Sequence, residues 1–190
     1  ERGLPADRSL LVLLDGGKGL RSAVREVFGE WALVQRCRVH KTRNVAEHLS
    51  AGKASLVRTA MREAWALTDA DKAKARLEKL ARRLDESHPS AAASLREGLD
   101  ETLTVMRLGL GPSLLRSLSS TNCIESMFSI VRRVTARVDR WRSGRMVLRW
   151  ALAGVLEAER HFIRVRGQGE LPKLVRALRE RDLARAQRAA

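Results

Sequence analysis

The stretch from Ser9 to Leu20 constrains the fold of this chain more than any other segment. Its apolar run, Leu10 to Leu14, is unbroken and of strand length, which is typical of a strand buried on both faces. The run ends at Asp15, and Gly16-Gly17 predicts a turn. A helix is expected from about Lys18, because Leu20, Val24 and Phe28 recur along one helical face.

Asp15 is a candidate functional residue because of its place in this unit. A carboxylate that follows a buried strand and precedes a glycine turn lies where α/β sheets bind ligands. The alternative is that Asp15 caps the following helix or belongs to an ordinary Asp-Gly turn. On this stretch alone the capping or turn role is the preferred interpretation.

The charge of the chain indicates a polyanionic partner. The 190 residues include 37 Lys and Arg against 22 Asp and Glu, a formal net charge of +15, and are 44% hydrophobic. A packed domain that binds nucleic acid is therefore expected, in preference to a merely solvated basic surface. No apolar run is long enough to cross a membrane, and two cysteines are too few for a disulfide framework, so an intracellular protein is expected.

After the first helix the sequence predicts a second short strand over Trp31–Cys37, followed by a strongly basic segment. The pattern then becomes helical, and we predict a mixed α/β, predominantly helical fold divided into four parts. These are a core segment (1–44), an all-helical insertion (45–118), further core helices (119–165) and a basic C-terminal helix (166–190).

Glu125 is the second candidate carboxylate. A helix is expected from Asn122 to about Val138, with a buried stripe that begins at Cys123. Glu125 lies off that stripe, on a basic face. Together with Asp15 it would suit a divalent metal, because Mg²⁺ takes hard oxygen ligands and commonly one or two carboxylates.

Cys37-x-x-His40 permits a zinc interpretation, with Cys123 and His48 as further ligands. A structural zinc site needs four ligands, and the chain has no second Cys-x-x-Cys or His-x-x-His pair. A buried cysteine with a hydrogen-bonding histidine is the preferred interpretation.

Three motifs taken together resemble the Mutator-type transposases of bacterial insertion sequences. The first is the Arg2-Gly3-Leu4 lead-in with the strand that ends in Asp15-Gly16. The second is Gln35-Arg36-Cys37-x-x-His40-Lys41-x-Arg43-Asn44, and the third is Ser120-Thr121-Asn122-x-Ile124-Glu125-Ser126. Their order and spacing extend over almost the whole chain.

The resemblance implies a ribonuclease-H-like core with a triad of two aspartates and one glutamate, interrupted by a helical insertion. Asp15 would be the second aspartate and Glu125 the glutamate, and the two would hold Mg²⁺ or Mn²⁺. The first aspartate would lie upstream of Glu1, so we expect the isolated chain to be inactive. Cys37 and His40 match the family's Cys-x-x-His signature, with a structural or DNA-positioning role.

The resemblance also implies partners and surroundings. Double-stranded DNA, at element ends and at the target, would be bound by basic side chains that face phosphates, namely Arg36, Lys41, Arg43, Arg132 and Arg133. The full-length enzyme is expected to be a homo-oligomer in the bacterial cytoplasm, associated with the nucleoid and not with a membrane.

Two functions from different classes remain open at this point. The first is the C-terminal part of a transposase catalytic domain, in which metal-activated water cuts a phosphodiester and the freed 3′-hydroxyl attacks target DNA. The alternative is a non-catalytic, basic DNA-binding or interaction relic of a transposase.

Overall fold

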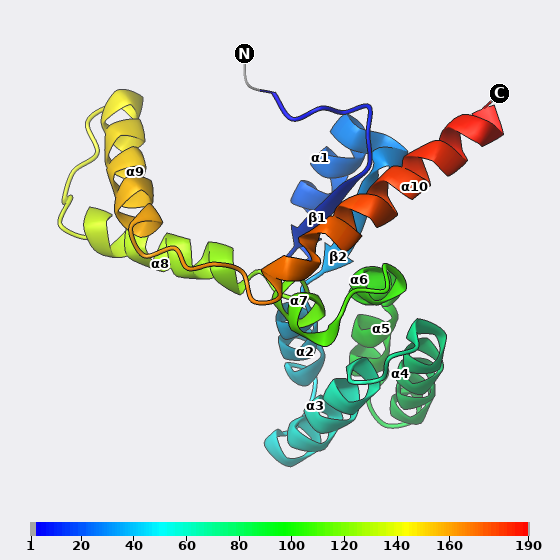
Figure 1. The fold of residues 1–190 in the computed structure, drawn as a ribbon. Helices are drawn as coiled ribbons and strands as arrows, with labels where there is room; N and C mark the ends of the chain where they lie inside the picture. The colour runs from blue at the N-terminus through cyan, green and yellow to red at the C-terminus, as the bar shows by residue number, and fades with distance from the viewer. Residues whose placement is uncertain (1–2, 190) are drawn as a thin grey trace. The chain divides into compact units, whose positions relative to one another are not determined.

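The fold is mixed α/β and predominantly helical, as a computed structural model that describes residues 3–189 shows (Figure 1). The chain divides into two compact units. One contains the residues up to Ser120 together with those from Arg166 onward, and the other is Thr121–Val165. Within the described residues, no helix is both long and apolar enough to span a membrane.

The larger unit is built on a two-stranded parallel sheet of β1 (Leu10–Leu14) and β2 (Ala32–Arg36). The register pairs Leu10 with Ala32 and Leu14 with Arg36. Helix α1 (Lys18–Phe28) and the short turn η1 (Gly29–Trp31) connect the strands. The predicted order of strand, glycine turn, helix and second strand is therefore confirmed.

Burial of β1 differs from the prediction. Leu14 is buried, but the other β1 residues are only half-buried. The sheet is also small: within residues 3–189, β1 has a paired strand on one edge only. A long apolar run predicts a strand, but it does not predict how many strands and helices pack against that strand.

Helices alone fill the segment from 45 to 118 within the part of the chain that the structure describes. After α2 (Arg38–Ala46) the elements are α3 (Ala51–Trp65), α4 (Ala70–Asp85), α5 (Pro89–Arg96), η2 (Asp100–Leu103), α6 (Thr104–Arg107) and α7 (Pro112–Ser117). Their core includes Met61, Leu77, Leu84, Leu95 and Leu103. Whether these helices form an insertion in a larger catalytic fold stays a prediction.

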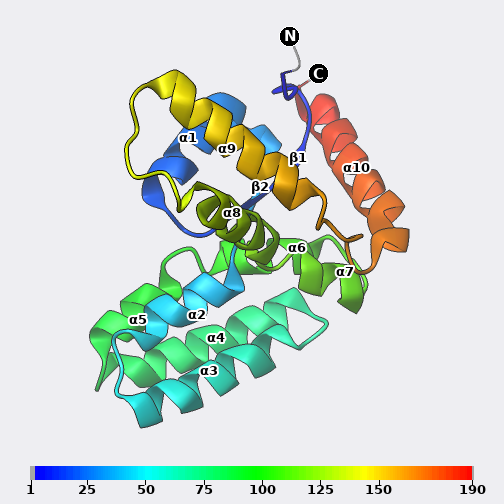
Figure 2. The ribbon, with the colours of Figure 1, turned by 90° about the vertical axis from the view of Figure 1, so that its left-hand side faces the viewer.

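The C-terminal helix α10 (Leu171–Ala189) follows the turn η3 (Gln168–Glu170) and lies alongside the sheet (Figures 1 and 2). Polar contacts attach it there. The backbone N–H of Ser9 donates to Asp182, Arg181 donates to the Ser9 hydroxyl, and Arg185 lies 4.5 Å from the centre of the Trp31 ring. The beginning and end of the described chain therefore stabilise one another.

The smaller unit consists of α8 (Asn122–Thr135) and α9 (Gly144–Glu159), joined by a loop. The two helices come into close contact at Gly154, where a Cβ atom would lie only 2.9 Å from the Cα of Val131. The predicted stripe of α8 is half-buried at Met127, Val131 and Val134, but Cys123 is exposed, contrary to the prediction. A pair of helices shields only the sides that face each other, which is why so little of this unit is fully buried.

Candidate functional site at the carboxyl edge of the sheet

Asp15 follows the last residue of β1, at the carboxyl edge of the parallel sheet. Its side chain is exposed, and one carboxylate oxygen accepts a hydrogen bond of 2.8 Å from the backbone N–H of Gly17. Gly16, between them, has a φ of 109°, a backbone conformation that residues other than glycine rarely adopt. The turn role of Asp15 is thus confirmed, and its carboxylate is nevertheless presented to solvent.

Cys37 occupies the corresponding position after β2. Its backbone N–H donates to the carbonyl of Leu14 over 2.7 Å, which extends the parallel ladder by one step. The Cys37 side chain is 1% exposed and precedes the first residue of α2. Because the strands are parallel, Asp15 and the start of α2 lie at the same edge of the sheet.

Arg36 is held against the Asp15 turn and does not project into solvent. Its guanidinium donates to the Glu97 carboxylate over 3.0 Å and to the Glu97 carbonyl over 3.1 Å. A Cβ atom added at Gly16 or at Gly98 would lie 2.7 Å from its nitrogens. The bond from Arg36 also holds the pKa of the Glu97 carboxyl below its usual range.

Lys41, in the first turn of α2, is 0% exposed. Its ammonium donates to the carbonyls of Ser94 and Glu97, each over 2.5 Å, and lies 3.4 Å from the Glu97 carboxylate. Burial, reinforced by the nearby charge of Arg36, lowers the pKa of Lys41 to about 8. Lys41 therefore attaches α2 to the end of α5.

Arg38 and Gln35 attach the same junction to the segment around Thr102. The Thr102 carbonyl accepts from Arg38 over 3.0 Å and from Gln35 over 3.1 Å, and the Gln35 amide oxygen accepts from the N–H of Val105. Burial lowers the pKa of Arg38 to about 10, and its guanidinium lies 5.5 Å from the Trp65 ring centre.

Four side chains thus connect the end of β2 and the start of α2 to the helical segment. We call these side chains, Gln35, Arg36, Arg38 and Lys41, the junction anchor.

The junction anchor changes the assignment of two predicted phosphate ligands. Arg36 and Lys41 bind protein groups and are buried, which argues against direct contact with a phosphate backbone. Arg43, further along α2, is exposed and stays a candidate for contact with phosphate. His40 is half-buried, and the buried state predicted for Cys37 is confirmed.

Glu125 lies in the first turn of α8 and is half-buried. Its carboxylate accepts a hydrogen bond of 2.9 Å from the hydroxyl of Thr121, the residue before the helix. Arg132 and Arg133 are exposed in the last turn of the same helix. Asp15 and Glu125 belong to different units, and their approach across the helical segment stays a prediction.

Sequence reasoning missed Glu97 and Thr102, the two residues on which the junction anchor converges. Both lie more than 60 residues after the strand they hold. The one local signal is Glu97-Gly98 at the end of α5, where Gly98 has a φ of 62° and leaves room for Arg36. That pair of residues predicts the end of a helix, but it does not indicate that the distant Arg36 binds there.

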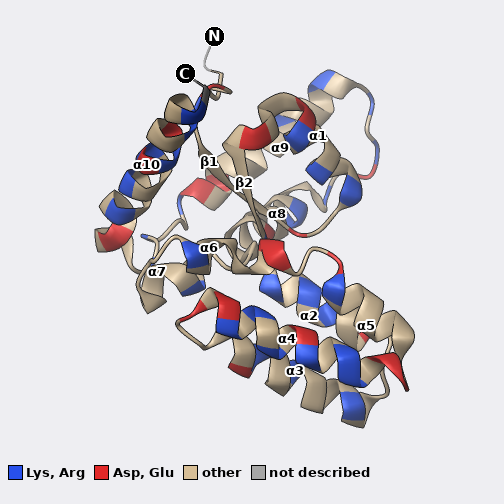
Figure 3. Cartoon of the chain, turned by 90° about the vertical axis from the view of Figure 1, so that its right-hand side faces the viewer, with Lys and Arg blue, Asp and Glu red and all other residues tan. Residues whose placement is uncertain are grey.

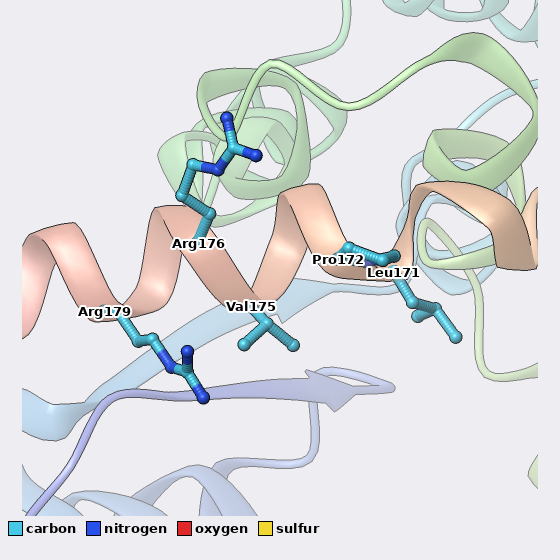
Figure 4. Close-up of a pocket in the computed structure, with 5 residues that line it drawn as sticks. All are labelled: Leu171, Pro172, Val175, Arg176 and Arg179. Atoms are coloured by element: carbon cyan, nitrogen blue, oxygen red, sulfur yellow. The ribbon is translucent and has the colours of Figure 1, made fainter.

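A shallow pocket of about 480 Å³ lies on α10 and is shown in Figure 4. It is lined by Leu171, Pro172, Val175, Arg176 and Arg179, all from this one helix. Basic residues are not confined to it, since Figure 3 shows Lys and Arg on α10 and also on α2 through α5. The pocket therefore offers a basic, apolar surface and no acid or nucleophile.

The carboxyl edge of a parallel sheet is where α/β proteins commonly bind ligands, and here it bears the exposed carboxylate of Asp15. The family comparison is more specific: residues 1–164 match the model described as Transposase, Mutator family. The chain belongs to the Mutator family of transposases.

Individual relatives agree with this assignment. The chain is 30% identical over 154 residues to the transposase for insertion sequence element IST2 of Acidithiobacillus ferrooxidans, covering 81% of this chain and 51% of that protein. It is 30% identical to the transposase for ISRM5 of Rhizobium meliloti (strain 1021), covering 80% of this chain and 38% of the relative. The transposase for IS6120 of Mycolicibacterium smegmatis is 32% identical, over 69% of this chain and 39% of its own length.

The chain thus spans about half or less of the length of these relatives. No solved structure gives a significant match.

Proposed function

We propose that this chain is the C-terminal part of the catalytic region of a DNA transposase, with Asp15 and Glu125 as two of its three catalytic carboxylates. The observation that carries the proposal is the exposed carboxylate of Asp15 at the carboxyl edge of a parallel sheet, in a chain of this family. The fold would be a ribonuclease-H-like core whose first aspartate lies on an upstream strand.

The two carboxylates suit a divalent metal by their chemistry. Asp15 accepts one backbone hydrogen bond and is otherwise open to solvent, and Glu125 lies in a polar helix start. Carboxylate oxygens of this kind are the ligands that Mg²⁺ prefers, and Mn²⁺ accepts them as well. Bound there, the metal would supply activation of the attacking oxygen and stabilisation of the leaving oxygen in phosphodiester cleavage.

The chain's own contribution to this site is positioning. The Gly17 N–H fixes the orientation of the Asp15 carboxylate, and the packing of Arg36 against Gly16 fixes the turn that carries it. The Thr121 hydroxyl plays the corresponding part for Glu125. We propose that duplex DNA, at element ends and at the target, contacts the exposed Arg43, Arg132 and Arg133.

The test is Asp15→Asn in a transposase that contains these residues together with the upstream aspartate. Asparagine keeps the oxygen that accepts from Gly17, so the turn and the stability of the fold are retained, but it removes the charge that a divalent cation needs. We expect DNA strand cleavage to fall by orders of magnitude while DNA binding is kept.

The matched control is Asp7→Asn, which removes an exposed carboxylate of the same type from the same part of the chain. It should cleave like the unmodified enzyme. If Asp15→Asn also cleaves at the unmodified rate, the catalytic assignment of Asp15 is wrong.

A further inference from the structure

Helix α9 has a second apolar stripe that its partner α8 does not use. Leu148, Leu152 and Leu156 recur every four residues and are 69%, 55% and 53% exposed. An exposed Arg145 precedes the stripe by three residues, and an exposed Glu159 follows it by three. Residues at these spacings share one side of a helix.

The stripe is distinct from the face that packs within the unit. Gly154 and Ala158 are the buried residues of α9, and Gly154 meets the backbone of Val131. Leu152 is two residues from Gly154, so at 3.6 residues per turn the two lie on nearly opposite sides of the helix. Contact with α8 therefore leaves the leucine stripe exposed.

The sequence of this stripe is complementary to itself in the antiparallel direction. When a second α9 runs antiparallel with the two Leu152 residues opposed, Leu148 faces Leu156 of the second copy. The same register places Arg145 beside Glu159 of the second copy, at both ends of the contact. A parallel arrangement would instead place Arg145 beside Arg145, so the charges select the antiparallel one.

We propose that the leucine stripe of α9, flanked by Arg145 and Glu159, is the surface on which two copies of this chain associate about a two-fold axis. Such an interface is isologous, with the same patch used by both copies. One pair of helices lies at the low end of the size range for specific interfaces, so the expected dimer is weak and concentration-dependent. The proposal does not depend on the catalytic roles of Asp15 and Glu125.

Charge reversal tests both the partner and the register. Arg145→Glu alone and Glu159→Arg alone each oppose like charges, and we expect either change to weaken dimerisation, measured by sedimentation velocity over a range of concentrations. The double variant Arg145→Glu/Glu159→Arg restores opposite charges and should restore the dimer. The two residues are about 21 Å apart along one helix, so the recovery cannot come from contact within a copy.

Cross-linking provides an independent measurement at the centre of the contact. With the exposed Cys123 changed to Ser, Leu152→Cys brings two thiols together on the two-fold axis and should form a disulfide-linked dimer under mild oxidation. Leu56→Cys is the matched control, because Leu56 is 69% exposed on α3, a helix outside the proposed interface. Circular dichroism establishes that each variant keeps its helices.

Recovery of the dimer in the double variant, with cross-linking at position 152 well above that at position 56, supports the proposal. A chain that stays monomeric at high concentration overturns it, since another part of the protein then covers the stripe. A dimer whose dissociation constant is unchanged by the charge reversals also overturns the proposal, because its interface then lies elsewhere.

Discussion

At the scale of single residues, the basic segment after β2 has a structural role that its composition does not reveal. Arg36, Arg38 and Lys41 donate to carbonyl and carboxylate groups of the helical segment and are buried. Burying a charged group is costly unless it is paired and hydrogen-bonded. Arg36 and Lys41 are paired with the Glu97 carboxylate, whereas Arg38 donates to the neutral carbonyl of Thr102 and its Nη2 atom is buried without a hydrogen-bond partner. Part of the +15 charge is thus buried in contacts within the protein.

The lowered pKa of Lys41 predicts a pH dependence of stability. Its folded pKa of about 8 lies below the ordinary 10.5, so between these values the unfolded chain binds more protons than the folded one. Stability therefore rises with pH across this window, and the gain is lost again as the pH falls through 8. Relative to Lys41→Met, the unmodified chain should gain on the order of 3 kcal/mol from pH 7 to 10.5.

Urea unfolding of both chains at a series of pH values measures this difference. Lys53→Met, which removes an exposed lysine from α3, controls for the loss of one positive charge. A difference between the unmodified chain and Lys41→Met that stays flat, or that shrinks as the pH rises, would contradict the buried charged state of Lys41.

At the scale of elements, the sequence predicts the strands, turns and helices that depend on interactions between neighbouring residues. The run Leu10–Leu14, the glycine turn and the helix from Lys18 were all predictable, because each follows from neighbouring residues. The start of α4 shows the limit of such patterns: Thr68 with Asp71 resembles a capping box, but Asp69 is the residue that accepts from the N–H groups of Asp71 and Lys72. Competing caps in adjacent positions differ too little for sequence to separate them.

Contacts between distant elements could not be predicted. Arg36 and Lys41 look like any exposed basic pair, because their partners near Glu97 lie far along the chain. Cys123 falls on the apolar stripe of α8, yet it is exposed, since α9 covers only part of that stripe. The candidate site could be predicted as far as the strand end that carries Asp15 and no further.

The contact between α8 and α9 depends on Gly154. A Cβ atom there would meet the Val131 backbone at 2.9 Å, and backbone cannot move aside without separating the helices. We expect Gly154→Val to destabilise this pair by about 1–3 kcal/mol, the usual cost of overpacking. Hydrogen exchange of the amides in α8 and α9 should quicken accordingly.

Gly52→Val is the matched control, because Gly52 lies in the first turn of α3 and no atom is within 4 Å of the added Cβ. It should leave exchange in α8 and α9 unchanged. Slow exchange in these helices after Gly154→Val would show that the close approach at Val131 does not limit their packing.

At the scale of the whole molecule, the chain carries its two candidate carboxylates on different compact units. Asp15 lies on the unit that contains the sheet, and Glu125 begins α8 of the smaller unit. We propose that the complete enzyme uses both carboxylates in one metal-dependent reaction. Glu125 is then required for cleavage but not for the fold or for DNA binding.

The most direct measurement is strand cleavage by Glu125→Gln in a transposase that contains this chain and the upstream aspartate. Glutamine keeps the length of the side chain and an oxygen that can accept from the Thr121 hydroxyl, but it removes the negative charge that holds a divalent metal. Cleavage should fall by orders of magnitude with DNA binding retained, whereas Glu26→Gln, at an exposed position on α1, should cleave normally. Cleavage by Glu125→Gln at the unmodified rate would contradict a catalytic role for Glu125.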